Sequence, residues 1–547
     1  MRGLALNSNR RDVLALSAMA VLVTVANMWK PFHIDDTAHL VIAQWIADNP
    51  LQPMSGMLNW GGIDEPIHRT NQPHLFFYLM AGWGRVFGWS EVAQHALLAI
   101  FSVACIVFTF RLARRLVPDH ALWATAILAL SPAFVVSQNM MVDIPLLAVW
   151  LWFFDTLADR PAVQQQRTRQ YLIAALAASC ALLIKYSSLA LLPILAFVII
   201  WDGRWRLLVV LLVPVAVLGA WSGFNIADYG GIHILQRSSG ARDWLQPARA
   251  AIAWVLILGG VTPLGLAWLA AQRRFGRWTA PLAAAIAAGV AALAALVALS
   301  AVTDAVADRL LWLAFALNGG LAGIALLPTA WTVVLALVQR APRSEETRLL
   351  VILFAWLACG AGFYILLAPF SAVRHVLSVL PALVLLVCFA MRSSLGARTK
   401  FWTLLGTIVL SIGVAAGDFR FAQFHKDQAL RIGRDPAIAA ATTNGTAWTS
   451  GHWGWQWYAD RQGLRQIDYR SSRPSSGDLF VEATGMDRHY RKDRLDLAFV
   501  KSISERRAVL NPVCTARPSR FYSSSHEDGP WSLSMDCAHR IDVYRVR

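Results

Sequence analysis

Residues 349–369 read LLVILFAWLACGAGFYILLAP, a run of apolar and small residues without a single charge. A helix of about 17–25 such residues is long enough to cross the hydrocarbon core of a bilayer. Twelve further apolar runs are bounded by charged residues, and they cover 12–29, 92–112, 121–139, 144–158, 170–184, 186–201, 207–225, 249–271, 279–302, 310–339, 375–391 and 401–417. The sequence therefore predicts a polytopic α-helical membrane protein with about 13 transmembrane helices.

The overall composition supports this prediction. The chain of 547 residues is 57% hydrophobic and only 15% charged, and its mean hydropathy is +0.48. Soluble domains average roughly 45–50% apolar and about 25% charged residues, which argues against a soluble enzyme, and a chain this apolar does not stay disordered. The net charge of +16 would suggest a nucleic-acid partner in a soluble protein, but in a membrane protein it is typical of basic cytoplasmic loops.

The positions of the basic residues predict the orientation of the chain. With thirteen crossings, the connections on one side carry 20 lysines and arginines, and the loops on the other side carry nine. Basic residues collect on the cytoplasmic side. We therefore expect a multi-pass protein of the inner, cytoplasmic membrane, with its N-terminus in the cytoplasm. The first run lacks a small-residue cleavage site, so we expect it to stay as an anchor.

The composition changes after the last apolar run and indicates two domains. We expect residues 1–417 to form the transmembrane domain, with a long outer loop at 30–91 that contains interfacial helices. Residues 418–547 are polar and are expected to form a small α/β domain in the periplasm or outside the cell. Strand-like runs at 478–482 and 541–545 indicate β-structure in this domain.

Two features of the polar tail bear on its role. Trp453, Trp455 and Trp457 alternate, so in a strand they would share one face. Such a stripe is either part of the core or a surface that stacks on the sugar of an acceptor. Cys514 and Cys537 permit a disulfide in an oxidising compartment, whereas the other four cysteines lie in apolar runs and are explained as buried packing residues.

The long outer loop contains two groups of candidate site residues. Asp35 and Asp36 follow the first apolar run and begin a segment, 35–48, with the pattern of a short interfacial helix. They either cap this helix and favour its positive N-terminal dipole or serve as catalytic carboxylates, and the two roles are compatible. Further along, Arg69 and His74 lie in a polar segment that is either an ordinary loop or a wall that binds an anion.

Other outer connections carry isolated polar side chains. Asp143 lies between the third and fourth apolar runs, Lys185 occupies a short turn between two runs, and Arg374 and His375 begin the twelfth run. Each is explained by itself as an interfacial or snorkelling anchor. Under one topology, however, all of them fall on the outer face together with Asp35. Carboxylates and cations at one membrane surface can hold an acid–base group opposite a bound phosphate.

This constellation resembles the lipid-donor glycosyltransferases of the C-type membrane superfamily, which include protein O-mannosyltransferases, aminoarabinose transferases acting on lipid A and bacterial dolichyl-phosphate-mannose-type enzymes. The resemblance covers most of residues 12–391 and depends on the order and spacing of short motifs that are not specific one by one. In chain order they are Asp35-Asp36, Gln72-Pro73-His74-Leu75-Phe76-Phe77-Tyr78, Arg111-Leu112-Ala113-Arg114-Arg115-Leu116, Leu130-Ser131-Pro132, Asp143-Ile144-Pro145, Leu183-Ile184-Lys185, Arg374-His375-Val376-Leu377 and Leu380-Pro381-Ala382-Leu383.

Two positions depart from the usual pattern of this family. The family often has Asp-Glu where this chain has Asp35-Asp36, a change that keeps a carboxylate. It often has Lys or His followed by Pro-Pro where this chain has Gln72-Pro73-His74, so a cation that can contact the donor phosphate is missing. Arg69, His74 and Lys185 are the candidates to replace that cation.

The resemblance implies a glycosyltransferase that moves a hexosyl or pentosyl group, with inversion, from a polyprenyl-phosphate donor to an acceptor hydroxyl at the outer membrane face. Asp35 or Asp36 would be the general base, with Asp143 in support. The donor phosphate would be bound by Lys185, Arg374, His375, Arg69 and His74. The expected partners are the lipid-linked donor, membrane lipid and a glycan, lipid or protein acceptor, but no nucleic acid. Some relatives use a divalent metal ion, although no ligand cluster in this sequence demands one.

A membrane transporter or a flippase for lipid-linked glycans is the main alternative. Transporters often have paired repeats and broken helices with charges at mid-membrane, and the sequence shows neither feature. A third hypothesis is a structural subunit for polymer assembly without catalysis, in which the acidic pair would be dispensable. Release of lipid phosphate from a bound donor would separate the transferase from both alternatives.

Overall fold

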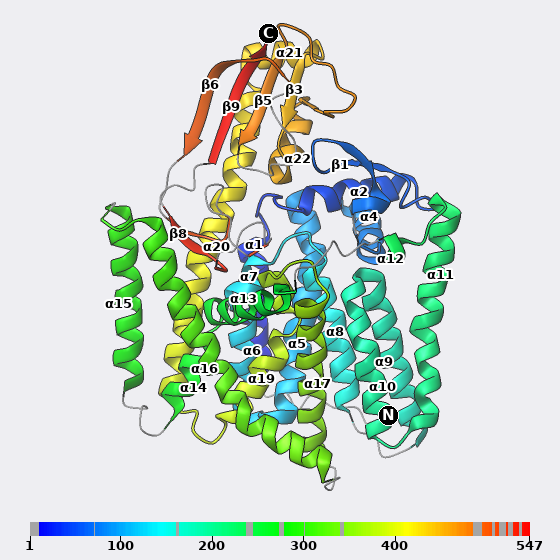
Figure 1. The fold of residues 1–547 in the computed structure, drawn as a ribbon, viewed down its shortest axis with the longest axis vertical. Coiled ribbons are helices and arrows are strands. Elements are labelled where there is room, and N and C mark those ends of the chain that lie inside the picture. Colours follow the sequence, from blue (N-terminus) through cyan, green and yellow to red (C-terminus); the bar gives the residue numbers. More distant parts are fainter. Residues whose placement is uncertain are drawn as a thin grey trace.

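The computed structural model describes residues 10–70, 72–159, 164–236, 244–272, 278–299, 301–339, 344–484, 495–505, 509–513, 521–522, 529–534 and 539–547. Helices form most of the molecule, and a small sheet lies at one end of the helical bundle (Figure 1). The fold is therefore predominantly helical with a β-containing C-terminal region, as the sequence predicts. The predicted pair Cys514 and Cys537 lies outside the described residues.

Each of the thirteen predicted apolar runs contains helix. Ten helices account for the greater part of these runs: α1 (Arg10–Asn27), α5 (Glu91–Leu116), α8 (Asp143–Ala158), α9 (Gln164–Ile184), α10 (Leu191–Trp201), α11 (Leu212–Tyr229), α15 (Thr279–Ala298), α16 (Asp304–Val338), α17 (Glu345–Leu366) and α20 (Ala397–Gly433). Within the described part of the chain, five helical stretches are long and apolar enough to cross a membrane, or six if one pair bent by 68° counts as a single span. The larger number of crossings stays a prediction.

Three of the apolar runs form broken helices. They are the pairs α6 (Ala121–Ala129) with α7 (Pro132–Val136), α13 (Gln246–Val261) with α14 (Leu264–Ala271), and α18 (Val373–Leu377) with α19 (Leu380–Ala390). Proline lacks the amide hydrogen that continues a helix, so it is favoured in the first turn. Pro132 accordingly begins α7, and the hydroxyl of Ser131 accepts a hydrogen bond from the Phe134 amide at 3.2 Å. The expectation that the chain lacks broken helices is therefore wrong, and this feature does not argue against a transporter.

The first outer loop lies across the end of the bundle that faces the sheet (Figure 1). It contains the predicted helix, α2 (Asp36–Asp48), followed by a short antiparallel hairpin of β1 (Met57–Asn59) and β2 (Asp64–Pro66). The helices α3 (Ile67–Thr70) and α4 (Leu75–Phe87) complete it. The apolar face of α2 is fully buried, which holds the start of this helix against the bundle.

The C-terminal region is joined to the bundle by α20, which continues from the bundle to the sheet (Figure 1). In spatial order the five strands are β4 (Arg465–Gln466), β3 (Ala447–Ser450), β5 (Leu479–Thr484), β9 (His539–Val546) and β6 (Leu497–Glu505). The strands β5 and β9 confirm the two predicted strand runs. The predicted domain boundary after residue 417 falls inside α20, and the division into two domains stays a prediction.

The prediction of a strand through the alternating tryptophans is wrong, because residues Trp453–Arg461 form the helix α22. Trp455 is buried and donates a hydrogen bond from its indole nitrogen to Thr449 Oγ1 at 2.9 Å, and Trp457 packs edge-to-face on Phe32. Tertiary contacts with the first outer loop, rather than the alternation of tryptophans in the sequence, determine the conformation of this segment. A β-carbon on Gly454 would lie 2.1 Å from the carbonyl oxygen of Phe32, so only glycine permits this close approach.

A second part of the tail inserts into the bundle. The strands β7 (Val509–Asn511) and β8 (Ser532–Ser534) pair with each other, and β7 packs against α20. A β-carbon on Gly417 would lie 1.8 Å from the carbonyl oxygen of Leu510, so the strand and the helix touch through their backbones. Trp531 donates a hydrogen bond from its indole nitrogen to the carbonyl oxygen of Gly260 at 2.7 Å. The tail and the bundle therefore share one core.

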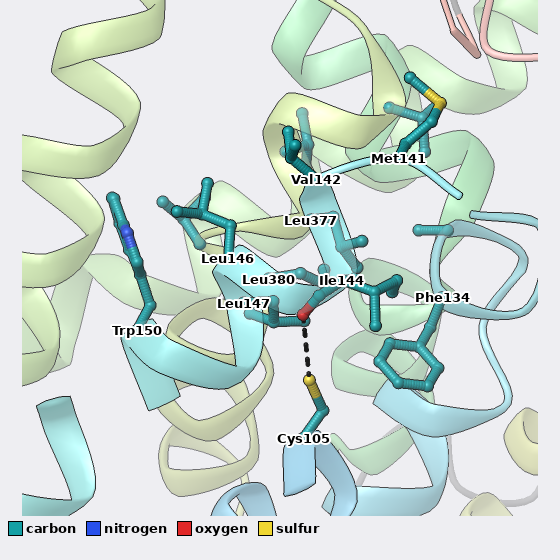
Figure 2. Close-up of a cluster of buried hydrophobic side chains, with 14 of the residues drawn as sticks. Cys105, Phe134, Met141, Val142, Ile144, Leu146, Leu147, Trp150, Leu377 and Leu380 are labelled. Atoms are coloured by element: carbon teal, nitrogen blue, oxygen red, sulfur yellow. Dashed lines mark hydrogen bonds between the residues drawn. The ribbon is translucent and has the colours of Figure 1, made fainter. Parts of the chain in front are cut away.

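A compact apolar cluster lies around the start of α8 (Figure 2). Ile144, Leu146 and Leu147 pack against Leu377 and Leu380 of the broken pair α18–α19. The thiol of Cys105 in α5 donates a hydrogen bond to the Ile144 carbonyl oxygen at 3.7 Å. Buried side chains of this size fix the relative positions of the elements that carry them. The cluster thus fixes the start of α8 against α18, which are the elements that carry Asp143 and Arg374.

Candidate active site

The first component of the site is an ion pair between Asp35 and Arg374. Asp35 immediately precedes α2 and Arg374 lies in α18, and Nη1 of the arginine donates to Oδ2 of the aspartate at 2.9 Å. The Asp35 and Arg374 side chains keep 23% and 15% of their exposure, so the pair is reachable from outside. Asp35 is the N-cap residue of α2, but its side chain makes no capping hydrogen bond. Its carboxylate faces Arg374 instead.

The second component is a more deeply buried ion pair. Lys185, in the turn after α9, donates to Oδ1 of Asp143, the first residue of α8, at 2.9 Å. Arg374 interacts electrostatically with both Asp35 and Asp143. Two carboxylates and two cations from four distant parts of the sequence therefore alternate in one cluster.

Aromatic rings and a histidine flank the two cations. His375 stacks on Tyr364 of α17, with ring centroids 4.6 Å apart and an interplanar angle of 15°. The Lys185 ammonium lies 5.9 Å from the centroid of the same tyrosine ring, and the tyrosine hydroxyl donates to Ser187 Oγ at 3.1 Å. His375 also interacts electrostatically with Lys185 and Arg374. Lys185, Arg374 and His375, predicted separately, are thus brought together.

His39 lies near Asp35, and the completely buried His74 packs on the same ring, Phe77, as His39. His39, which the sequence analysis missed, is one turn after Asp35 on α2, and its Nδ1 lies 2.7 Å from the carbonyl oxygen of Met140. Burial lowers the pKa of His39, although Asp35 and Asp36 oppose this effect. Burial, with the nearby His233 and His39, lowers the pKa of His74 well below its ordinary value. A neutral His74 does not supply the cation that replaces the missing family residue.

Arg69 and the tail tryptophans differ from the clustered residues in their surroundings. Arg69 is exposed on the short helix α3, whereas Lys185 is buried. Trp455 and Trp457 are buried in the core, and Trp453 alone keeps intermediate exposure. Of the predicted phosphate ligands, Lys185 and Arg374 are therefore the two basic side chains that ion pairs hold in a fixed position.

The two adjacent aspartates face different neighbours. The Asp36 side chain is completely buried, and its Oδ2 accepts a hydrogen bond from the backbone amide of His33 at 3.0 Å. Asp35, by contrast, is partly exposed and contacts Arg374. The acidic pair thus consists of one carboxylate that faces the cation cluster and one that is enclosed by protein.

A metal ion has no evident set of ligands in the described part of the chain. Within it, no three His, Cys, Asp or Glu side chains are grouped so that they could hold a metal ion. Each carboxylate of the cluster is already paired with a cation. We therefore name no metal ligands.

A comparison of the sequence with protein families finds one match in the first half of the chain. Residues 71–224 match the model of the family described as dolichyl-phosphate-mannose-protein mannosyltransferase. This segment includes both members of the Asp143–Lys185 pair and His74. Over residues 71–224 this match confirms the predicted resemblance to dolichyl-phosphate-mannose-type enzymes. No curated protein matches the chain.

Three solved structures show some similarity to this chain. ArnT from Cupriavidus metallidurans, crystallised with undecaprenyl phosphate, aligns over 89% of this chain and 96% of its own, with 14% identity and a TM-score of 0.40. The Archaeoglobus fulgidus oligosaccharyltransferase aligns over 84% and 64%, with 12% identity and a TM-score of 0.44. The S. cerevisiae Pmt1–Pmt2 complex, bound to the sugar donor, aligns over 41% and 33%, with 17% identity and a TM-score of 0.29. With TM-scores below 0.5, these structures do not define the fold of this chain.

Proposed function

We propose that the protein is a membrane glycosyltransferase that moves a sugar from a polyprenyl-phosphate donor to an acceptor hydroxyl. The observation that supports this function most directly is the alternating cluster of Asp35, Arg374, Asp143 and Lys185. It places a partly exposed carboxylate, Asp35, and a partly exposed cation, Arg374, beside the more deeply buried Lys185–Asp143 pair at the ends of apolar helices. Such charges are costly beside a bilayer and are retained there mainly for function.

Asp35 is the proposed general base. It is the partly exposed member of the acidic pair, and a base must come within about 2.6–3.2 Å of the proton that it removes. Asp36 is enclosed by protein and cannot meet an acceptor without rearrangement. The sequence left the choice between the two aspartates open, and their different exposure favours Asp35.

The reaction needs a single displacement. Asp35 removes the proton of the acceptor hydroxyl, the hydroxyl oxygen bonds to C1 of the sugar, and the bond between C1 and the phosphate oxygen breaks. The electron pair of that bond remains on the phosphate, and the configuration at C1 inverts. Arg374 and Lys185 offset the charge that grows on the leaving phosphate. Arg374 has five donors, so its contact with Asp35 leaves others for the phosphate.

We further propose that the thirteen helical segments cross the inner membrane, with the N-terminus in the cytoplasm and residues 418–547 outside. The excess of basic residues in one set of connections supports this orientation. An outward-facing site suits a lipid-linked donor, because nucleotide sugars are not supplied there. Of the tail tryptophans, only Trp453 is exposed enough for an acceptor contact, and we assign that role to it alone.

Single cysteines at exposed positions are expected to report this orientation. In a chain whose six native cysteines are replaced by alanine, Arg473→Cys in the tail should react with a membrane-impermeant maleimide in intact spheroplasts. Ser393→Cys, in the exposed turn after α19, should react only after permeabilisation. Labelling of both positions, or of Ser393→Cys alone, in intact spheroplasts would contradict the proposed orientation.

The proposed reaction is tested by following both of its products. Mass spectrometry of lipid-linked sugars and envelope glycans in a deletion strain should show a donor that accumulates and a glycan that loses its sugar. The purified protein, supplied with that donor and acceptor, should then release polyprenyl phosphate in equal amount to the glycosylated acceptor. A flippase would move the donor across a vesicle membrane without releasing lipid phosphate, and that result would overturn the proposal.

A further inference from the structure

A second buried ion cluster lies behind the acidic pair and takes no direct part in the proposed chemistry. Asp418 of α20 forms an ion pair with Lys30, with Oδ2 of the aspartate 2.5 Å from Nζ of the lysine. Its Oδ1 lies 3.0 Å from His33 Nε2. Tyr522 of the tail donates its hydroxyl to the same carboxylate at 2.9 Å. Lys30 also donates to the Asn139 side chain at 2.5 Å. The Asp418 carboxylate therefore joins the segment after α1, α20 and the tail, and Lys30 links this cluster to the segment after α7.

His33 connects this cluster to the acidic pair. Its Nδ1 lies 3.7 Å from Asp36 Oδ2, and its backbone amide donates to the same oxygen at 3.0 Å. The side chains of His33, Asp36 and Asp418 are at most 1% exposed. An imidazole between two buried carboxylates is the arrangement expected for an imidazolium, because with Lys30 it gives the group two positive and two negative charges.

The backbone between His33 and Asp35 is strained. Ile34 has a φ of 52°, in the left-handed region that β-branched residues rarely adopt. Strain of this kind persists only where the surrounding contacts impose it, and it gathers at functional sites. The contacts on either side are the Asp36–His33–Asp418 chain and the Asp35–Arg374 pair. The turn at Ile34 is thus held from both sides, and it directs the two adjacent carboxylates to different neighbours.

We propose that Asp418, His33 and Asp36 form a positioning centre that holds the strained turn and thereby aims Asp35 at the acceptor. This inference rests on the proposed function, since it takes Asp35 as the base. Asp36 then acts through the backbone rather than on the substrate. Because Asp418 lies in α20 and contacts Tyr522, the orientation of Asp35 then depends on how the C-terminal region packs against the bundle.

The test replaces Asp418 by Asn in the full-length protein and measures kcat and KM separately. We expect kcat to fall about 10–100-fold, because a misplacement of the order of 1 Å can cost about 10²-fold, while the donor KM stays within about threefold. Asp202→Asn is the matched control, since Asp202 forms a buried bidentate pair with Arg348 at the end of α10 away from Lys185. It should lower thermal stability without lowering kcat.

His33→Gln supplies the second variant, because glutamine keeps hydrogen-bonding capacity without a charge. In the double variant with Asp418→Asn, the loss in kcat should be no larger than in either single variant, since both act through one chain of contacts. Losses that multiply, an unchanged kcat in folded Asp418→Asn, or an equal loss in Asp202→Asn would overturn the inference. Inactive Asp35→Asn with fully active Asp418→Asn would refute the positioning centre alone, whereas fully active Asp35→Asn would refute the proposed base.

The charge of His33 gives a measurement that is independent of turnover. Burial and Lys30 lower the pKa of His33, but Asp418 and Asp36 outweigh them and raise it above its ordinary value of 6.5. Tyr522 and His95 are the other ionisable groups that face it. A raised pKa stabilises the folded state fully below about pH 6.5, and the benefit is lost as the pH rises through the folded-state value. The Tm advantage over His33→Gln should therefore shrink above pH 6.5, and a growing advantage would contradict an imidazolium.

Discussion

Asp35→Asn is expected to reduce kcat by about 10²–10⁴-fold, the range that general acid–base catalysis typically contributes. Asparagine has nearly the same shape and can still contact Arg374, so the site should keep its structure. Donor binding should remain or become tighter, because the Asp35 carboxylate no longer competes with the lipid phosphate for Arg374. The measurement is kcat from lipid-phosphate release, together with the Kd of the donor from a binding assay.

The pattern across the acidic pair makes this expectation specific. Asp36→Asn removes a fully buried carboxylate that faces His33, so it should lower thermal stability as well as kcat. Asp35→Asn should lower kcat with little change in stability. Full turnover by Asp35→Asn would exclude Asp35 as the base, and unchanged lipid-phosphate release by both variants would exclude the acidic pair from the catalytic machinery.

Much of the site was predictable because topology constrains which charges can meet. Asp143 and Lys185 are 42 residues apart, yet both were expected on the outer face from the alternation of basic loops, and the structure pairs them. Their partners were not predictable, since pairing depends on how helices pack. The same holds for Asp35 and Arg374, whose contact spans most of the transmembrane part of the chain.

Of the residues that sequence analysis missed, Asp418 had a recognisable feature and His33 had none. Asp418 was grouped with the polar tail because it follows an apolar run, although it lies inside α20 and is fully buried. The signal that drew attention to Asp143, a lone carboxylate at the end of an apolar run, applies equally to Asp418. His33 gave no comparable signal, since its role depends on a left-handed turn at Ile34 that composition does not reveal.

The alternating tryptophans show the opposite error. A period of two is typical of strands, but Trp455 and Trp457 are buried by contacts from different sides of a helix. In a short segment whose surroundings are all protein, most side chains are buried in any conformation. The periodicity of buried side chains then says little about secondary structure. Gly454, which permits close approach to the backbone of Phe32, was the better local signal of a tightly packed segment.

Lys185→Met is expected to have the second large effect, and it changes two properties at once. Removing the ammonium takes away a charge that offsets the leaving phosphate, a loss of about 10²–10³-fold in kcat by comparison with other transition-state donors. It also leaves Asp143, whose side chain is only 4% exposed, without its partner. Removal of one member of a buried ion pair typically costs about 3–5 kcal/mol, so the variant should also lose thermal stability.

The double variant Asp143→Asn with Lys185→Met separates these two effects. A neutral amide in place of the carboxylate removes the unpaired buried charge, so most of the lost Tm should return. Turnover should not return, because the charge opposite the phosphate is still missing. If turnover recovers together with Tm, Lys185 serves only to neutralise Asp143, and Arg374 is left as the cation opposite the leaving group. If neither recovers, the pair is needed to hold α8 against α9, and the loss of turnover then follows from the loss of structure.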